Sequence, residues 1–202
     1  MNYIDGFFEE LDKEVGRPLK VILTGAMAGV ILGHIRPSMD IDFEIEFTSG
    51  GEPSEKVIEG IEAAIRSASK KTKLPAQYSE NIQGWSQISF LDYREKSILY
   101  KKIGKIEVRL MAPEHWTIGK MARYLELDKM DIAFILKKHP ISHERIIAVW
   151  AEALKKSMRS DRSREFRDHV IDFFKTEGKK IWNGSFDAIA ATEKFKKLAG
   201  IS

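Results

Sequence analysis

The range Val21–Phe47 constrains the fold more than any other part of the chain. An apolar run at residues 21–23 predicts a buried strand, which Gly25 ends, and the small apolar residues after it predict a short helix. Residues 40–47 then alternate strictly between acidic and apolar side chains, as a strand with one buried face does. Residues 21–47 therefore form a predicted strand–helix–strand unit.

Two features of this unit indicate phosphate and metal chemistry. Asp40 and Asp42 lie two residues apart on a strand, so both carboxylates project from one face and can bind a hard cation. Magnesium favours one or two carboxylates, with waters and substrate phosphates completing its shell. Gly25 lets the backbone approach a ligand, and a helix start favours phosphate. The alternative is an ordinary edge strand with a solvated acidic face.

The order of these residues carries a resemblance. Leu23–Ala26, a short helix, Arg36-x-Ser38 and then Asp40-Ile41-Asp42 resemble the signature of the DNA polymerase beta-like nucleotidyltransferase superfamily. Ala26 stands where many relatives keep a serine. The resemblance implies Mg²⁺ (or Mn²⁺) bound by the acid pair, an NTP substrate, and these nucleotide-binding residues: Thr24, Gly25, Ala26, Arg36 and Ser38.

The superfamily normally adds a third carboxylate from a later strand, and two residues are candidates for it. Glu107 alternates with apolar neighbours on a predicted strand, so it points away from the core and is the first choice as a catalytic and metal-binding residue. Asp92 is the second choice. A solvent-exposed glutamate is the alternative explanation of Glu107.

A second stretch, from Met111 to Ile132, resembles a Pro-Glu-Asp…Lys…Asp-x-x-Asp-Ile block of the abortive-infection and toxin-type branch of that superfamily. The resemblance implies functional roles for Lys120 and for Asp128 or Asp131. Two alternatives remain open: Asp128 can cap the helix that follows it, and Lys120 can be a surface residue.

Composition limits the remaining possibilities. The chain has 202 residues, which suits one domain with or without a helical appendage, and it has no cysteine for disulfides or thiolate metal sites. No apolar run approaches the roughly 20 residues that span a bilayer. The acidic, amphipathic N-terminus does not resemble a signal peptide. We therefore expect a cytoplasmic protein without membrane contact.

Positive charge gathers in the last third of the chain. The net charge is +3, and residues 140–202 hold 13 Lys or Arg against 9 Asp or Glu, with the excess concentrated at residues 155–167. Such a run can meet a polynucleotide backbone. A solvated helix face is the commoner explanation.

The rest of the pattern predicts helices at 2–15 and 55–69, then strands at 85–91, 97–103 and 105–110. Helices at 114–124, 127–138, 142–158, 162–177 and 185–198 follow. We expect an α/β (α+β) fold with a nucleotidyltransferase-type mixed sheet flanked by helices, over residues 1–112. Residues 113–202 are expected to form a C-terminal helical bundle packed on this core.

The expected activity is magnesium-dependent transfer of a nucleotide from an NTP to a hydroxyl on RNA, protein or a small molecule. The toxin-type resemblance implies a toxin–antitoxin or phage-defence pair with an antitoxin partner protein. A rival interpretation is a catalytically inactive nucleotide-binding or protein-interaction module with the same fold, and a third is RNA binding by the basic C-terminal helices.

Overall fold

A computed structural model describes residues 3–33, 40–47 and 53–201 of the chain. It divides into two compact units. Unit 1 comprises Met1–Ile31, Ile35–Ile82 and Lys96–Met111, and unit 2 comprises Gln83–Glu95 and Ala112–Ser202 with the short segment Leu32–His34. The division differs from a single boundary after residue 112, because residues 83–95 pack with the helices of unit 2.

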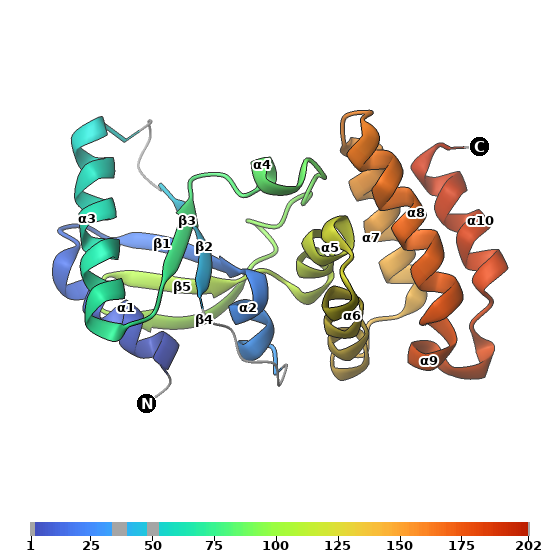
Figure 1. The fold of residues 1–202 in the computed structure, drawn as a ribbon, viewed down its shortest axis with the longest axis horizontal. Coiled ribbons are helices and arrows are strands. Elements are labelled where there is room, and N and C mark those ends of the chain that lie inside the picture. The colour runs from blue at the N-terminus through green and yellow to red at the C-terminus, as the bar shows by residue number, and fades with distance from the viewer. Residues whose placement is uncertain (1–2, 34–39, 48–52, 202) are drawn as a thin grey trace. The chain divides into compact units, whose positions relative to one another are not determined.

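Unit 1 is built on a mixed sheet, which in the described residues has five strands in the order β3-β2-β1-β5-β4 (Figure 1). β1 pairs antiparallel with β2 and parallel with β5, β2 pairs parallel with β3, and β4 pairs antiparallel with β5. The strands are β1 (Leu19–Thr24), β2 (Ile41–Glu46), β3 (Ala76–Ser79), β4 (Ile98–Ile103) and β5 (Ile106–Leu110). The chain is thus mixed α/β, with a mixed sheet.

The alternating apolar and acidic residues of β2 place their side chains on opposite faces of this sheet. Leu23 pairs with Phe43, and Phe43 contacts the rings of Phe7 and Phe8 on α1 (Tyr3–Glu14), so this face is apolar and covered. α3 (Glu55–Thr72) packs against α1. The opposite face presents the acidic side chains of β2. The short α2 (Gly25–Ile31) follows β1 directly.

Unit 2 is helical. Its core contains an aromatic cluster around Trp150, whose indole N–H donates to the Thr117 hydroxyl (3.0 Å) and whose ring contacts Phe173 and Phe174. These aromatics are fully buried, as expected of core residues rather than a base-stacking surface. The elements are α4 (Gln83–Ser86), α5 (Pro113–Arg123), α6 (Glu126–Lys138), α7 (His143–Lys156), α8 (Asp161–Thr176), α9 (Gly178–Trp182), η1 (Asn183–Ser185) and α10 (Ala188–Ala199).

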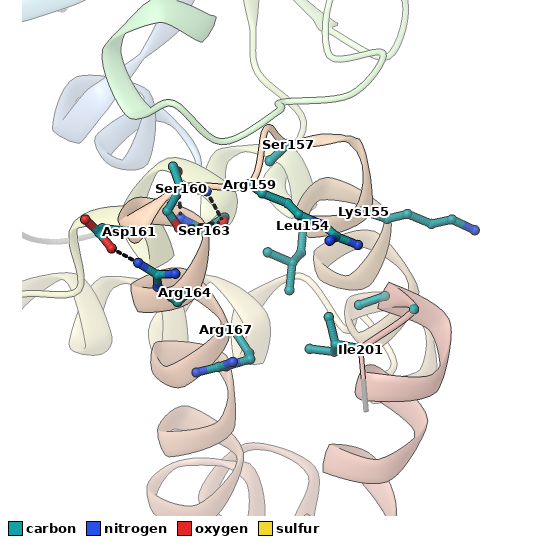
Figure 2. A pocket seen from close by; sticks show the side chains of 12 residues that line it. Leu154, Lys155, Ser157, Arg159, Ser160, Asp161, Ser163, Arg164, Arg167 and Ile201 are labelled. Carbon is teal, nitrogen blue, oxygen red and sulfur yellow. Dashed lines mark hydrogen bonds and ion pairs between the residues drawn. The ribbon is translucent and has the colours of Figure 1, made fainter.

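The ends of α7, α8 and α10 enclose a surface cavity of about 670 Å³, lined entirely by residues of unit 2 (Figure 2). No helix in the described part of the chain is long and apolar enough to cross a membrane.

The strand predicted at 85–91 is wrong. Residues 83–86 form α4, and the backbone after it is irregular, with left-handed conformations at Gln87 (φ +56°) and Leu91 (φ +60°). The apolar residues Ile88 and Phe90 are buried, but they pack within unit 2, where Phe90 contacts Tyr93. Alternation over a few residues reports burial of one side and does not by itself require strand pairing.

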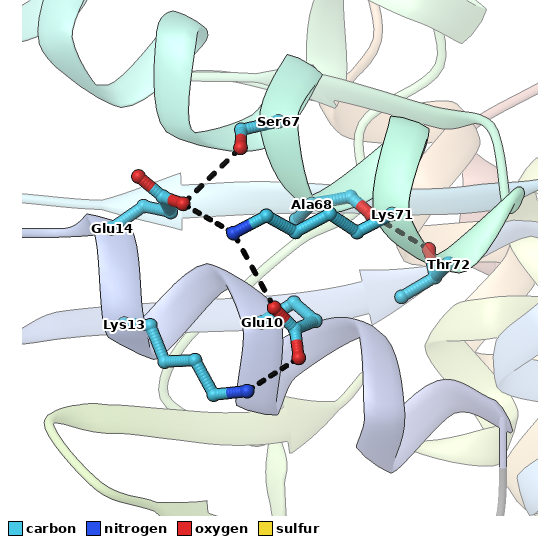
Figure 3. A network of polar contacts seen from close by, with 7 residues as sticks. All are labelled: Glu10, Lys13, Glu14, Ser67, Ala68, Lys71 and Thr72. Carbon is cyan, nitrogen blue, oxygen red and sulfur yellow. Dashed lines mark hydrogen bonds and ion pairs between the residues drawn. The ribbon is translucent and has the colours of Figure 1, made fainter.

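A polar network on the surface of unit 1 joins α1 to α3 (Figure 3). The Lys71 ammonium donates to Glu14 (2.6 Å) and lies 3.5 Å from Glu10, which also accepts from Lys13 (2.5 Å). Ser67 donates a second hydrogen bond to Glu14 (3.2 Å). The hydrogen bond from Lys71 is the main reason that the pKa of Glu14 lies below its ordinary value.

Replacing Lys71 by methionine is expected to raise the pKa of Glu14 toward its ordinary value. The lowered pKa means that the Glu14 charge stabilises unit 1 above the ordinary pKa, and that this contribution is lost as the pH falls through the lowered value. Carboxyl ¹³C NMR titration measures the change directly, with Lys70→Met on the same helix as the control. An unchanged Glu14 pKa in the Lys71 variant would contradict the assignment.

Candidate functional site

Asp42 lies directly against Gly25. Thr24, the last residue of β1, pairs with Asp42 on β2, and Gly25 follows with φ +63°. A Cβ added to Gly25 would lie 1.9 Å from Asp42 Oδ2 and 2.8 Å from its carboxyl carbon. Both the backbone conformation and the approach of the carboxylate therefore require glycine at this position. The predicted phosphate-approach glycine and one predicted metal ligand are in contact.

Asp40 immediately precedes β2 and is partly exposed, like Asp42. Glu44, next along the same face as Asp42, is fully buried and accepts a hydrogen bond from the Ile82 N–H (2.9 Å). It is thus held as a structural acceptor. Among the described residues, no group of three or more His, Cys, Asp or Glu side chains is arranged to hold a metal ion. The acid pair, Asp40 and Asp42, provides two carboxylates at the start of β2.

Glu107 does not lie beside the acid pair. Its side chain lies on the same face of the sheet as that of Asp42. Glu107 pairs with Lys20 of β1, however, and Lys20 lies four residues before Thr24, the partner of Asp42. That offset corresponds to about 13 Å along the strand direction. Mg²⁺ binds oxygen at about 2.1 Å, so one ion cannot bridge the two positions. Glu107 instead accepts a hydrogen bond from Arg109 (2.9 Å).

The position on the β5 side that is level with Asp42 belongs to Met111. Its N–H donates to the carbonyl of Leu23 (3.0 Å), continuing the parallel pairing by one residue, and its side chain is fully buried. Asp92, the other candidate for the third carboxylate, belongs to unit 2. There its Oδ1 lies 3.2 Å from Nε2 of the buried His115. Within unit 1 no third carboxylate accompanies the acid pair in the part that the structure describes.

The remaining predicted nucleotide-binding residues divide into two groups. Thr24 ends β1 and Ala26 belongs to the first turn of α2, so both flank Gly25. Arg36 and Ser38 lie outside the described residues.

The second predicted block forms an ionic cluster in unit 2, which we call the Lys120 cluster: Lys120, Arg123, Asp128 and Asp131. The Lys120 ammonium donates to Asp131 (2.8 Å) and lies 3.2 Å from Asp128. Arg123 donates to both oxygens of Asp128 (2.7 and 2.6 Å), which also accepts from the Leu125 N–H (3.1 Å). Asp128 is fully buried, and Lys120 is 5 % exposed.

The geometry of the Lys120 cluster tests the two alternatives that the sequence left open, a capping role for Asp128 and a surface position for Lys120. Asp128 does cap α6, since its carboxylate accepts from the backbone ahead of the helix. Lys120 is not a surface residue; its ammonium is enclosed by the two aspartates and lies 5.2 Å from the centre of the Trp116 ring. Sequence reasoning missed Arg123, although its position three residues after Lys120 places both on one side of a helix.

The charges in this cluster shift the titration of Asp128. Burial raises the pKa of its carboxyl, but the hydrogen bonds from Arg123 and the charges of Lys120 and Arg123 outweigh burial, so the pKa lies below its ordinary value. The ionised form therefore stabilises unit 2 above the ordinary pKa, and this contribution is lost as the pH falls through the lowered value.

The stability lost in Asp128→Asn is accordingly expected to be largest near pH 7 and to shrink as the pH falls below about 4. All four tryptophans of the chain belong to unit 2, so tryptophan fluorescence during urea unfolding reports this unit alone. A loss that stays constant between pH 7 and pH 3 would show that the carboxylate charge does not stabilise the fold.

Comparison with protein-family models, with curated proteins and with solved structures found no match to this chain.

Proposed function

We propose that the protein is a magnesium-dependent nucleotidyltransferase that moves a nucleotide from an NTP to a hydroxyl acceptor. The observation that carries the proposal is the contact between Asp42 and Gly25. The absence of a side chain at Gly25 gives space to a carboxylate that can share a cation with phosphates, at the point where β1 ends and α2 begins. Resemblance of the surrounding residues to the polymerase beta-like signature supports the same chemistry.

In the proposed reaction the acceptor oxygen attacks the α-phosphorus of the NTP, and the bond from that phosphorus to the bridging oxygen of the pyrophosphate breaks. Bound magnesium would neutralise the phosphates during this displacement. Asp40 and Asp42 would hold the ion, and Gly25 leaves the space that the Asp42 carboxylate occupies. The toxin-type resemblance extends the proposal to an RNA or protein acceptor and an antitoxin partner, with the protein acting in the cytoplasm.

A second candidate function is nucleotide binding without turnover. The buried Met111 stands level with Asp42 where a third carboxylate would complete the metal site, and Ala26 offers no hydroxyl to the triphosphate. Both observations favour a module that binds an NTP and does not transfer it.

Label transfer separates the two candidates. Natural protein is incubated with each α-³²P-labelled NTP and magnesium, alone and with total tRNA or a protein extract, and compared with Asp42→Asn and Glu107→Gln. The proposal predicts label on an acceptor with the natural protein and with Glu107→Gln, but none with Asp42→Asn. Metal-dependent NTP binding without label on any acceptor would instead establish the second candidate.

A further inference from the structure

The cavity among the ends of α7, α8 and α10 is strongly basic (Figure 2). Its lining includes Lys155, Arg159, Arg164 and Arg167 against a single carboxylate, Asp161. The formal charge of the lining, +3, equals the net charge of the entire chain. We call this cavity the basic pocket.

The cations of the basic pocket are only partly neutralised. Arg164 pairs with Asp161, and Arg167 pairs with Asp168 (2.8 Å). In the described part of the chain, Arg159 has no acidic partner within 4 Å. Its side chain lies centrally among the lining side chains in Figure 2. Lys155 extends away from the other lining side chains in the same view. Among the described lining residues, Arg159 is therefore the unpaired arginine, whereas Arg164 and Arg167 are held in exposed ion pairs whose carboxylates a ligand phosphate would have to displace.

The helix ends do not explain this charge. The first turn of α8 contributes positive potential to the pocket, but the C-terminal ends of α7 and α10 contribute negative potential from the other side. The positive potential of the pocket therefore comes from the arginine side chains. Guanidinium groups match phosphate geometry better than ammonium groups do, because each presents two parallel N–H donors.

The rest of the lining limits the class of ligand. Leu154, Ala199 and Ile201 give the pocket an aliphatic part, and no aromatic side chain lines it in the described residues. Proteins that bind single-stranded nucleic acid combine basic grooves with aromatic rings on which bases stack. A volume of about 670 Å³ is instead typical of a small-molecule site.

We propose that the basic pocket binds a small molecule carrying several phosphates, held by Arg159, Arg164 and Arg167. The basic pocket shares no residue with the proposed nucleotidyl-transfer site, because its lining belongs to unit 2 and the acid pair belongs to unit 1. It requires no metal, since the arginines themselves neutralise the phosphates.

The test uses inorganic tripolyphosphate as the probe, titrated calorimetrically in EDTA so that no magnesium site contributes. The natural protein is expected to bind it, and Arg159→Gln and Arg164→Gln are each expected to weaken binding about tenfold. Arg162→Gln is the matched control, because Arg162 lies on α8 between lining residues, pairs with Glu165 (2.9 Å) and does not line the pocket. Asp42→Asn is expected to bind the probe normally, which keeps this result independent of the transferase proposal.

The proposal is overturned if tripolyphosphate does not bind, or if it binds equally to the natural protein and both pocket variants. Binding weakened as much by Arg162→Gln as by the pocket variants would indicate diffuse surface attraction. A 12-nucleotide single-stranded RNA that binds through the pocket arginines while tripolyphosphate does not would assign the surface to nucleic acid. Near-UV circular dichroism of each variant verifies that unit 2 is folded.

Discussion

Replacing Lys120 by methionine is expected to lower the free energy of unfolding of unit 2 by about 3–5 kcal/mol. Methionine preserves most of the volume and removes the ammonium, with both its charge and its hydrogen bond to Asp131. The side chains of Asp128 and Asp131 are 0 % and 3 % exposed, so water cannot replace the lost ammonium. Removing one partner from a buried ionic cluster costs far more than the intact cluster contributes, because the remaining charges stay buried.

Tryptophan fluorescence during urea unfolding measures this loss in unit 2 alone. Lys156→Met is the matched control: Lys156 lies on α7 and pairs with Glu152 (2.9 Å), but both side chains are more than half exposed. Its loss is expected to cost about 0.3–0.5 kcal/mol. A Lys120 variant of natural stability that loses label transfer would contradict the structural role and assign Lys120 to the substrate.

Replacing Gly25 by alanine is expected to destabilise unit 1 by about 1–3 kcal/mol and to abolish magnesium-dependent NTP binding. The new Cβ would be forced into a left-handed backbone conformation and would overlap the Asp42 carboxylate. Since the carboxyl carbon and Cβ of Asp42 are also within 3 Å of the new atom, the whole side chain must move. The acid pair would then lose its geometry.

Hydrogen exchange of the β1 amides measures this effect, because unit 1 contains no tryptophan. Gly60→Ala, inside α3 with open space around its position, is the control and is expected to be neutral or stabilising by up to about 1 kcal/mol. In an Asp42→Ala background, Gly25→Ala should cost less, since only the backbone strain remains. An equal cost in both backgrounds would show that the two side chains do not compete for space.

The sequence pattern predicted β2 because apolar side chains cover one of its faces, and it predicted β1 because the consecutive residues Val21–Leu23 are buried on both faces. β3, by contrast, is four residues long and contains no fully buried residue, so its sequence carries no clear period. The misassigned residues Ile88 and Phe90 show the opposite case, in which alternation marks burial in unit 2 without strand pairing.

The sequence predicted which strands carry the candidate site residues, but it did not predict how those strands pair. The alternation around Glu107 correctly placed its side chain off the core, yet only the pairing of Lys20 with Glu107 reveals its distance from Asp42. Pairing depends on strand order and direction, which no local pattern encodes. The burial of Lys120 was equally hidden, because a lysine is almost never fully buried unless partners such as Asp128 and Asp131 enclose it.

Calorimetric titration of each NTP with magnesium is the most direct test of the central claim, that the acid pair and Gly25 form a metal-dependent nucleotide site. We predict that the natural protein binds at least one NTP, that EDTA abolishes the heat, and that magnesium alone gives little. Asp42→Asn should lose this binding, whereas Glu107→Gln, the same chemical change on the same face of the sheet, should retain it. Absence of binding to any NTP by folded natural protein, or equal binding by Asp42→Asn, would contradict the claim.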